Sequence, residues 1–216
     1  MKIPTGKLLL CGGGLLLAAA LCLTAYNVWD AYRAKMDSEQ ALQEIQVEVP
    51  VQDPPVSSEM VDDPDSVPPE PEPLPDYILD PDMEMPEIEI DGEVYIGTLD
   101  IPALELSLPV MSEWSYPKLK LAPCRYKGSA YRNDLIICAH NYNSHFGRLK
   151  ELEPGDEIVF TDADGNAFFY SVVATETLAP TAIDEMKSSG WDLTLFTCTI
   201  GGAKRVTVRC KQNHTI

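Results

Sequence analysis

The sequence predicts a mainly β protein built as one closed or nearly closed β-barrel, and three observations support this. From about residue 87 onward, apolar residues form short runs or alternate with polar ones, at 104–108, 135–139, 158–160 and 167–173, as is typical of strands. Turn residues separate these runs, such as Asp-Ala-Asp-Gly at 162–165. Within this strand-rich region, one stretch, residues 144–151, fits a short helix. Several short strands within ~120 residues close most readily into a barrel.

Charge is distributed very unevenly along the 216 residues, which suffice for one ordinary domain with additional segments. The net charge of −18 divides into +3 for residues 1–36, −19 for residues 37–97 and −2 for residues 98–216. The predicted barrel is therefore nearly neutral. We expect no nucleic-acid partner, because no part of the chain carries a large excess of basic residues.

The amino end predicts a membrane anchor. Lysines precede an apolar run over residues 8–26, close to the ~17–25 residues that a spanning helix needs. This charge pattern predicts that residues 1–7 lie in the cytoplasm and that the chain after residue 26 lies outside. Two alternatives are a signal peptide cleaved after the alanines at 18–20 and a lipoprotein modified at Cys11. The anchor is favoured because the apolar run continues past the alanines and the bulky Leu10 precedes Cys11.

A proline- and acid-rich segment follows the anchor. Residues 27–49 are expected to be helical or disordered, whereas residues 50–86 hold eleven of the eighteen prolines and predict an extended, disordered stalk. At ~3.1 Å per residue this stalk would reach on the order of 100 Å. It is alternatively a mere solubilising spacer, or residues 77–79 fold back as a lid. The catalytic domain is expected at 87–211, with a tail at 212–216, so a fragment starting near Glu87 should fold and be active.

Three residues at predicted strand ends form a candidate catalytic group. Cys198 ends the sequence Thr-Leu-Phe-Thr-Cys, Arg205 opens an Arg-Val-Thr-Val-Arg strand, and His140 follows the apolar run 135–139. Acyl transfer needs a nucleophile, a group that manages the proton, and positive charge at the developing oxyanion. A short connection at 199–203 predicts an antiparallel hairpin that places Arg205 beside Cys198.

Each of these assignments has a competitor. Cys198 is alternatively an inert core cysteine. His145 competes with His140 but lies in a polar segment. Arg209 shares a strand face with Arg205 but lies roughly 13 Å further from the turn. We therefore expect Arg205→Lys to lower turnover by orders of magnitude and Arg209→Lys to be nearly neutral.

Metal sites are not expected, and neither is a cofactor. Cys138, His140 and Cys198 are conceivable ligands, and the turn at 162–165 resembles half of a calcium loop but lacks the later ligands. Two of the six cysteines, Cys11 and Cys22, lie in the apolar run. If Cys198 is the nucleophile, at most one disulfide can form among Cys124, Cys138 and Cys210.

The residues around this group resemble those of the sortases, the Gram-positive cell-surface transpeptidases. The similarity covers roughly residues 94–211 and includes the Thr-Leu-x-Thr-Cys string, the following Arg, the strand ending in His140, Ile-Gly-Thr-Leu-Asp-Ile-Pro at 96–102 and Leu-Glu-Pro-Gly-Asp at 152–156. One departure is Ala139, where the family usually has Gly. The resemblance implies a sortase-like closed barrel of about seven or eight strands with one or two short helices.

The resemblance also implies a reaction. Cys198 would attack the Thr-Gly bond of a Leu-Pro-x-Thr-Gly-like sorting signal and form a thioacyl enzyme. His140 would move the proton and Arg205 would stabilise the oxyanion, with Thr197, Ala139 and Asn141 as further substrate-binding candidates. The implied partners are sorting-signal peptides of secreted surface proteins and an amine acceptor, either a peptidoglycan precursor or a pilin-like protein.

The resemblance leaves the subclass open, with class D-like and class B-like members as candidates. The short connection 178–192 disfavours a subclass with a large inserted helix there. Two other classes of function compete with transpeptidation: a cysteine hydrolase of the cell envelope and a non-catalytic surface-binding module. The module predicts no selective thiol reactivity at Cys198, whereas both enzymes require it.

Overall fold

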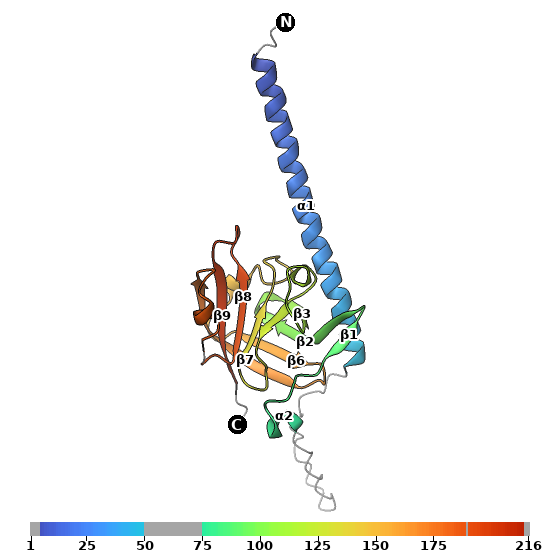
Figure 1. Ribbon diagram of the computed structural model, residues 1–216, viewed down its shortest axis with the longest axis vertical. Coiled ribbons are helices and arrows are strands. Elements are labelled where there is room, and N and C mark those ends of the chain that lie inside the picture. The colour runs from blue at the N-terminus through green and yellow to red at the C-terminus, as the bar shows by residue number, and fades with distance from the viewer. Residues whose placement is uncertain (1–4, 50–74, 189, 214–216) are drawn as a thin grey trace, which may run out of the picture.

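The computed structural model describes residues 5–49, 75–188 and 190–213. Nine strands form one sheet in the order β1-β2-β3-β4-β5-β8-β9-β7-β6, and a further pairing of β6 with β2 closes β2 to β9 into an eight-stranded barrel (Figure 1). The predicted fold class is therefore confirmed. The strands are β1 (Ile88–Ile90), β2 (Glu93–Ile101), β3 (Leu106–Met111), β4 (Cys124–Lys127), β5 (Leu135–Cys138), β6 (Glu157–Asp162), β7 (Ala167–Leu178), β8 (Leu193–Cys198) and β9 (Arg205–Gln212).

Apart from one long N-terminal helix, the helices of the described residues are single short turns. The helices are α1 (Thr5–Glu48), α2 (Asp76–Leu79) and α3 (Ile183–Met186), with 3₁₀ turns η1 (Pro102–Leu104), η2 (Lys118–Lys120) and η3 (Leu149–Glu151). The helix expected over 144–151 is thus wrong in extent, since only its last three residues are helical. Leu104 likewise belongs to η1 and not to a strand, because Glu105 adopts a left-handed conformation with φ 53° that interrupts the alternation before β3.

The barrel interior is apolar, and the alternation of the strands produces it. In β6, residues Ile158, Phe160 and Asp162 are buried while their neighbours are not. The seam between β2 and β6 depends on Gly97, which has φ +142°, and a Cβ there would lie 1.9 Å from the carbonyl oxygen of Thr161. Glycine is required at this position because the two backbones approach too closely for a side chain.

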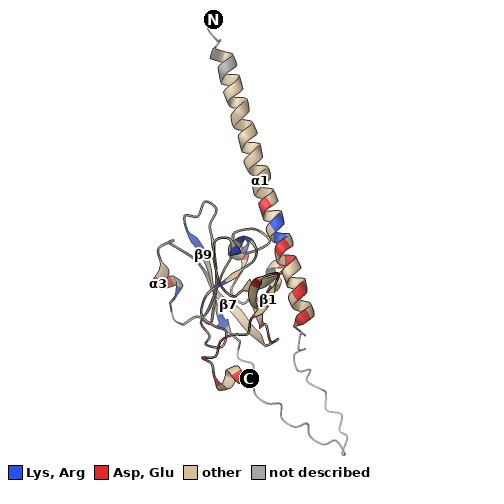
Figure 2. Ribbon diagram, turned by 45° about the vertical axis from the view of Figure 1, so that its right-hand side comes forward, with Lys and Arg blue, Asp and Glu red and all other residues tan. Residues whose placement is uncertain are grey.

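Helix α1 has two halves with different surroundings. Its N-terminal half is long and apolar enough to cross a membrane and projects away from the barrel, whereas its charges are concentrated in the C-terminal half (Figures 1 and 2). The C-terminal half lies against β1 and β3. Its buried residues are Ala34, Ser38, Ala41 and Ile45, followed by Val49 directly after the helix, and their spacing of three to four residues makes one helical face. This face packs onto Ile90, Tyr95 and Met111.

The residues before β1 also contribute to the core. Met85 is buried, and Tyr77 of α2 stacks on Tyr131 with ring centroids 4.7 Å apart. The expected stalk 50–86 therefore overlaps the packed part of the chain from residue 75, and residues 50–74 lie outside the described residues. Tyr77 also contacts Phe168, near the end of β7 that is opposite the end paired with Arg205. The proposed lid at 77–79 thus lies at the far end of the barrel from Cys198 and does not cover it.

Candidate active site

Three strands bring the predicted catalytic residues to one rim of the barrel. The parallel pairing of β5 with β8 places Cys138 opposite Phe196, so His140 comes level with Cys198 two residues further along. On the other side, the antiparallel pairing of β8 with β9 places Cys198 opposite Arg205. Cys198 therefore ends a central strand with His140 on one flank and Arg205 on the other.

A groove of about 420 Å³ opens at Cys198. Its walls are the loop after β5 and the start of the β8–β9 connection, and the lining residues are Asn141, Asn143, Phe146, Gly147, Lys150, Glu151, Thr197, Cys198, Thr199, Ile200 and Val206. The thiol is exposed at this groove.

The side chains of His140 and Arg205 each contact a group other than Cys198. Arg205 Nη1 donates to the carbonyl oxygens of Gly202 at 3.0 Å and Lys204 at 3.1 Å. The imidazole of His140 stacks on the ring of Tyr142, with centroids 4.3 Å apart and planes 7° from parallel. Among the described residues, no hydrogen bond joins Cys198 to either side chain. The backbone thus places the three residues together at the rim of the groove.

The cysteines differ sharply in environment. Cys124, Cys138 and Cys210 are buried, whereas Cys198 is exposed, and all are unbonded to one another. Burial raises the pKa of Cys124 to about 12 and that of Cys210 to about 12, and it also raises the pKa of Cys138. These three thiols stay protonated at neutral pH, so we expect thiolate reactivity outside the membrane segment to be confined to Cys198.

The loop that follows His140 is tightly folded. The backbone N–H of Phe146 donates to the carbonyl of His140 at 3.2 Å, and that of Gly147 donates to the carbonyl of Tyr142 at 2.8 Å. A Cβ at Gly147 would lie 2.6 Å from the carbonyl oxygen of Asn141. The backbone N–H of Asn141 donates to Nδ1 of His140 at 3.0 Å. These bonds fix the backbone on which the imidazole is carried.

The three predicted substrate-binding residues occupy different positions. Thr197 and Ala139 are both buried, and the Thr197 hydroxyl donates to the Ala139 carbonyl at 2.8 Å. That bond ties the ends of β8 and β5 together and thereby supports the spacing between Cys198 and His140. Asn141 is half-buried and lines the groove together with Thr197, whose hydroxyl is already bonded to the Ala139 carbonyl.

His145, the competitor of His140, is completely buried beneath the loop. Burial lowers its pKa to about 4, and neither ring nitrogen has a hydrogen-bond partner among the described residues. A neutral imidazole enclosed in this way cannot reach a substrate, which favours His140 as the proton carrier.

Two of the residues considered as metal ligands, Asp162 and Cys138, have structural contacts instead. The carboxylate of Asp162 accepts hydrogen bonds from Tyr131, the backbone N–H groups of Asp164 and Asn166, and the Asn166 amide, so it organises the β6–β7 hairpin. Cys138 is buried under α1 with Cys124. Within the described residues, no group of three or more His, Cys, Asp or Glu side chains is arranged to hold a metal ion.

Tyr142, Gly147 and Asp30 also contribute to the surroundings of His140, although no sequence pattern indicates them. The Tyr142 hydroxyl donates to Asp30 of α1, across 112 positions of the sequence. Tyr142 and Gly147 were detectable only as neighbours of His140 in the chain, and Asp30 carried no signal because its contact depends on how α1 docks.

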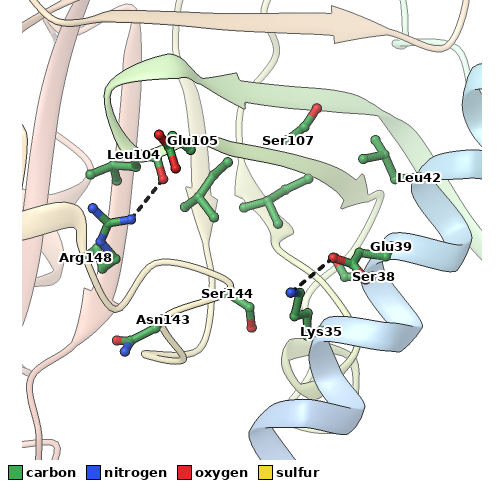
Figure 3. Close-up of a pocket in the computed structure, with 12 residues that line it drawn as sticks. Lys35, Ser38, Glu39, Leu42, Leu104, Glu105, Ser107, Asn143, Ser144 and Arg148 are labelled. Atoms are coloured by element: carbon green, nitrogen blue, oxygen red, sulfur yellow. Dashed lines mark hydrogen bonds and ion pairs between the residues drawn. The ribbon is translucent and has the colours of Figure 1, made fainter.

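A second groove of about 570 Å³ lies on the other side of the same loop, between α1 and β3. Figure 3 shows Asn143 and Ser144 on one wall and Lys35, Ser38 and Glu39 of α1 on another. Within this groove Lys35 lies 3.5 Å from Glu39, and Arg148 donates to the carbonyl of Leu104 at 3.0 Å. Asn143 lines both grooves, so the loop between β5 and η3 (residues 139–148) separates them.

Comparison with solved structures shows the same fold in several sortases. Sortase C1 of GBS pilus island 1 has a TM-score of 0.51 at 22% identity, covering 60% of this chain and 68% of that chain. The pilus-related sortase C of Group B Streptococcus has a TM-score of 0.51 at 23% identity, with 59% and 70% covered. The lid mutant of sortase A from Corynebacterium diphtheriae has a TM-score of 0.50 at 20% identity, with 56% and 72% covered.

No curated protein sequence matches the chain. The sequence model of the sortase domain, however, matches residues 99–213, which is more than half of the chain and includes all three residues of the candidate catalytic group. The protein therefore belongs to the sortase family.

Proposed function

We propose that this sortase is a membrane-anchored cysteine transpeptidase that cleaves a Leu-Pro-x-Thr-Gly-like sorting signal and joins the new carboxyl end to an amine. The observation that carries the proposal is the position of Cys198, whose exposed thiol lies at a groove. His140 comes level with it just beyond the end of β5, and Arg205 lies opposite it on β9. Family membership supports transpeptidation as the class of reaction.

The proposed first step forms a thioester. The Cys198 thiolate attacks the Thr carbonyl carbon, the Thr–Gly C–N bond breaks, and His140 supplies the proton that leaves with the glycine amine. Arg205 turns from the Gly202 and Lys204 carbonyls toward the oxyanion, which its fixed charge stabilises. A nearby cation also favours the thiolate form of a cysteine.

The proposed second step releases the product. An acceptor amine, from a peptidoglycan precursor or a pilin-like protein, attacks the thioester carbon, the C–S bond breaks, and His140 takes the proton that the amine loses. The N-terminal half of α1 fits a single membrane anchor. We propose that it holds the barrel on the outer face of the membrane, where both substrates are available.

The deciding experiment is to trap the thioester. The full chain is incubated with a Leu-Pro-x-Thr-Gly peptide, quenched in acid and digested, and we expect the mass of the acyl fragment on the peptide that contains Cys198. Cys198→Ala should lose both the adduct and all turnover while keeping its melting temperature, because an exposed thiol contributes little packing. Turnover by Cys198→Ala would refute the mechanism. Release of free acid in the presence of excess triglycine, with no ligated product, would instead identify a hydrolase.

A further inference from the structure

Helix α1 contacts the loop between β5 and η3 (residues 139–148) through the carboxylate of Asp30. One oxygen of this carboxylate accepts a hydrogen bond from the Tyr142 hydroxyl, and the other lies 3.3 Å from Nζ of Lys120. The Tyr142 hydrogen bond, followed by the Lys120 contacts and the nearby His140, holds the pKa of Asp30 below its usual value despite some desolvation. Asp30 lies four positions after the end of the predicted anchor, so this contact occurs where the chain leaves the membrane.

Tyr142 connects that carboxylate to the catalytic imidazole. Its ring stacks flat on His140 with centroids 4.3 Å apart, and it also contacts the buried His145 ring in an edge-type arrangement, with centroids 5.5 Å apart and planes at 64°. Tyr142 is therefore held at its hydroxyl by α1 and at its ring by two histidines. Desolvation and the charge of Asp30 both raise its pKa, so it stays a hydrogen-bond donor at neutral pH.

We propose that Asp30 and Tyr142 are positioning residues through which the anchor helix orients the imidazole of His140. This inference rests on the proposed function. A histidine side chain at the end of a strand can rotate about two bonds, and proton transfer requires a narrow range of those rotations. The stack against Tyr142 limits the rotation, and the Asp30 hydrogen bond fixes Tyr142. Undocking of α1 would release both constraints at once.

The test uses the full chain in lipid nanodiscs with the Leu-Pro-x-Thr-Gly peptide and triglycine. We expect Asp30→Asn and Tyr142→Phe each to lower kcat about tenfold with KM changed less than about twofold, because the first removes the charge of the acceptor and the second removes the donor hydroxyl, while the groove is unchanged. The double variant should be no slower than the slower single variant, because both changes act on the same hydrogen bond. Asp30→Glu should recover part of the rate.

Two matched variants control for these changes. Asp37→Asn makes the same charge change two turns further along α1, where Asp37 pairs, among the described residues, with Arg33 alone at 3.5 Å. Tyr116→Phe removes the hydroxyl of an exposed tyrosine outside both grooves. Both should retain wild-type kcat. Equal kcat in Asp30→Asn and Asp37→Asn would overturn the proposal, and so would a loss in Tyr142→Phe that is matched by Tyr116→Phe.

A second measurement does not depend on turnover. Carbethoxylation of His140 by diethyl pyrocarbonate, followed by peptide mass spectrometry, reports how freely the imidazole is exposed. Tyr142→Leu removes the stack and should accelerate this modification severalfold, whereas Tyr116→Leu should not. An unchanged rate would overturn the positioning role even if the enzyme is active. Conversely, a faster rate in a chain that never forms the Cys198 thioester would retain the positioning role and refute the proposed function.

Discussion

At the scale of single residues, the two arginines of β9 have different roles although the strand period places them on one face. Arg205 lies at the strand end beside Cys198, with its guanidinium on the turn. Arg209 is 2% exposed. Its guanidinium donates hydrogen bonds to the Glu176 carboxylate at 2.7 Å and the Thr194 hydroxyl at 3.1 Å. It also donates to the backbone carbonyls of Glu185 at 2.5 Å and Met186 at 3.0 Å. Arg209 therefore holds the end of α3 against the barrel, and its substitution cannot be neutral for stability.

We predict that Arg205→Lys lowers kcat/KM by about a hundredfold or more without changing stability, because a point charge does not reproduce the guanidinium fork. Arg209→Lys should lower the free energy of unfolding by roughly 2–4 kcal/mol, since several buried hydrogen bonds to a charged group are lost. Peptide ligation kinetics and urea unfolding of both variants measure the two effects. A stable but inactive Arg209→Lys would transfer the oxyanion role to Arg209.

At the scale of elements, the barrel core begins before β1. Residues 75–86 provide Met85, which is 3% exposed, and Tyr77, which stacks on Tyr131 and contacts Phe168. The expectation that the domain starts at residue 87 followed from composition, because prolines and carboxylates outnumber the few apolar side chains of this stretch. A short segment rich in proline and acidic residues can still fill a gap at the end of a barrel.

We predict that a fragment of residues 75–213 is more stable than one of residues 87–213 by roughly 2–4 kcal/mol, the value of burying a methionine and part of a tyrosine. Urea unfolding followed by fluorescence provides the comparison. Both fragments lack α1, so its absence cancels in the difference. Identical midpoints would show that residues 75–86 contribute nothing to the fold and would restore the start at residue 87.

At the scale of the whole molecule, the position of α1 changes how the barrel relates to the membrane. Val49, at the end of α1, is buried against the barrel, and Met85 is buried within it. Residues 50–74 therefore connect two parts of the same packed body and do not set its distance from the anchor. In Figure 1 the β8–β9 connection lies at the end of the barrel from which the N-terminal half of α1 projects. The reach of ~100 Å expected of an extended stalk does not apply to such an arrangement.

We predict that deleting residues 58–67 leaves ligation of a membrane-tethered sorting peptide within about twofold of wild type, because long connections cost little and their length is weakly coupled to stability. Proteoliposomes that carry both enzyme and tethered peptide provide the assay, and the soluble peptide serves as the reference. A strong loss confined to the tethered peptide would mean that this segment does act as a spacer.

Local patterns in the sequence were sufficient for the barrel, the β8–β9 hairpin and the apolar helix, because strand alternation, turn chemistry and hydropathy depend on neighbouring residues. They also placed Arg205 opposite Cys198, since an antiparallel hairpin has a register that short turns specify. Tertiary structure alone decided that α1 docks on the barrel, that Arg209 is buried, and that Asp30 meets Tyr142 beside His140. Those contacts join residues far apart in the chain, and they depend on which surfaces are complementary once the elements have formed.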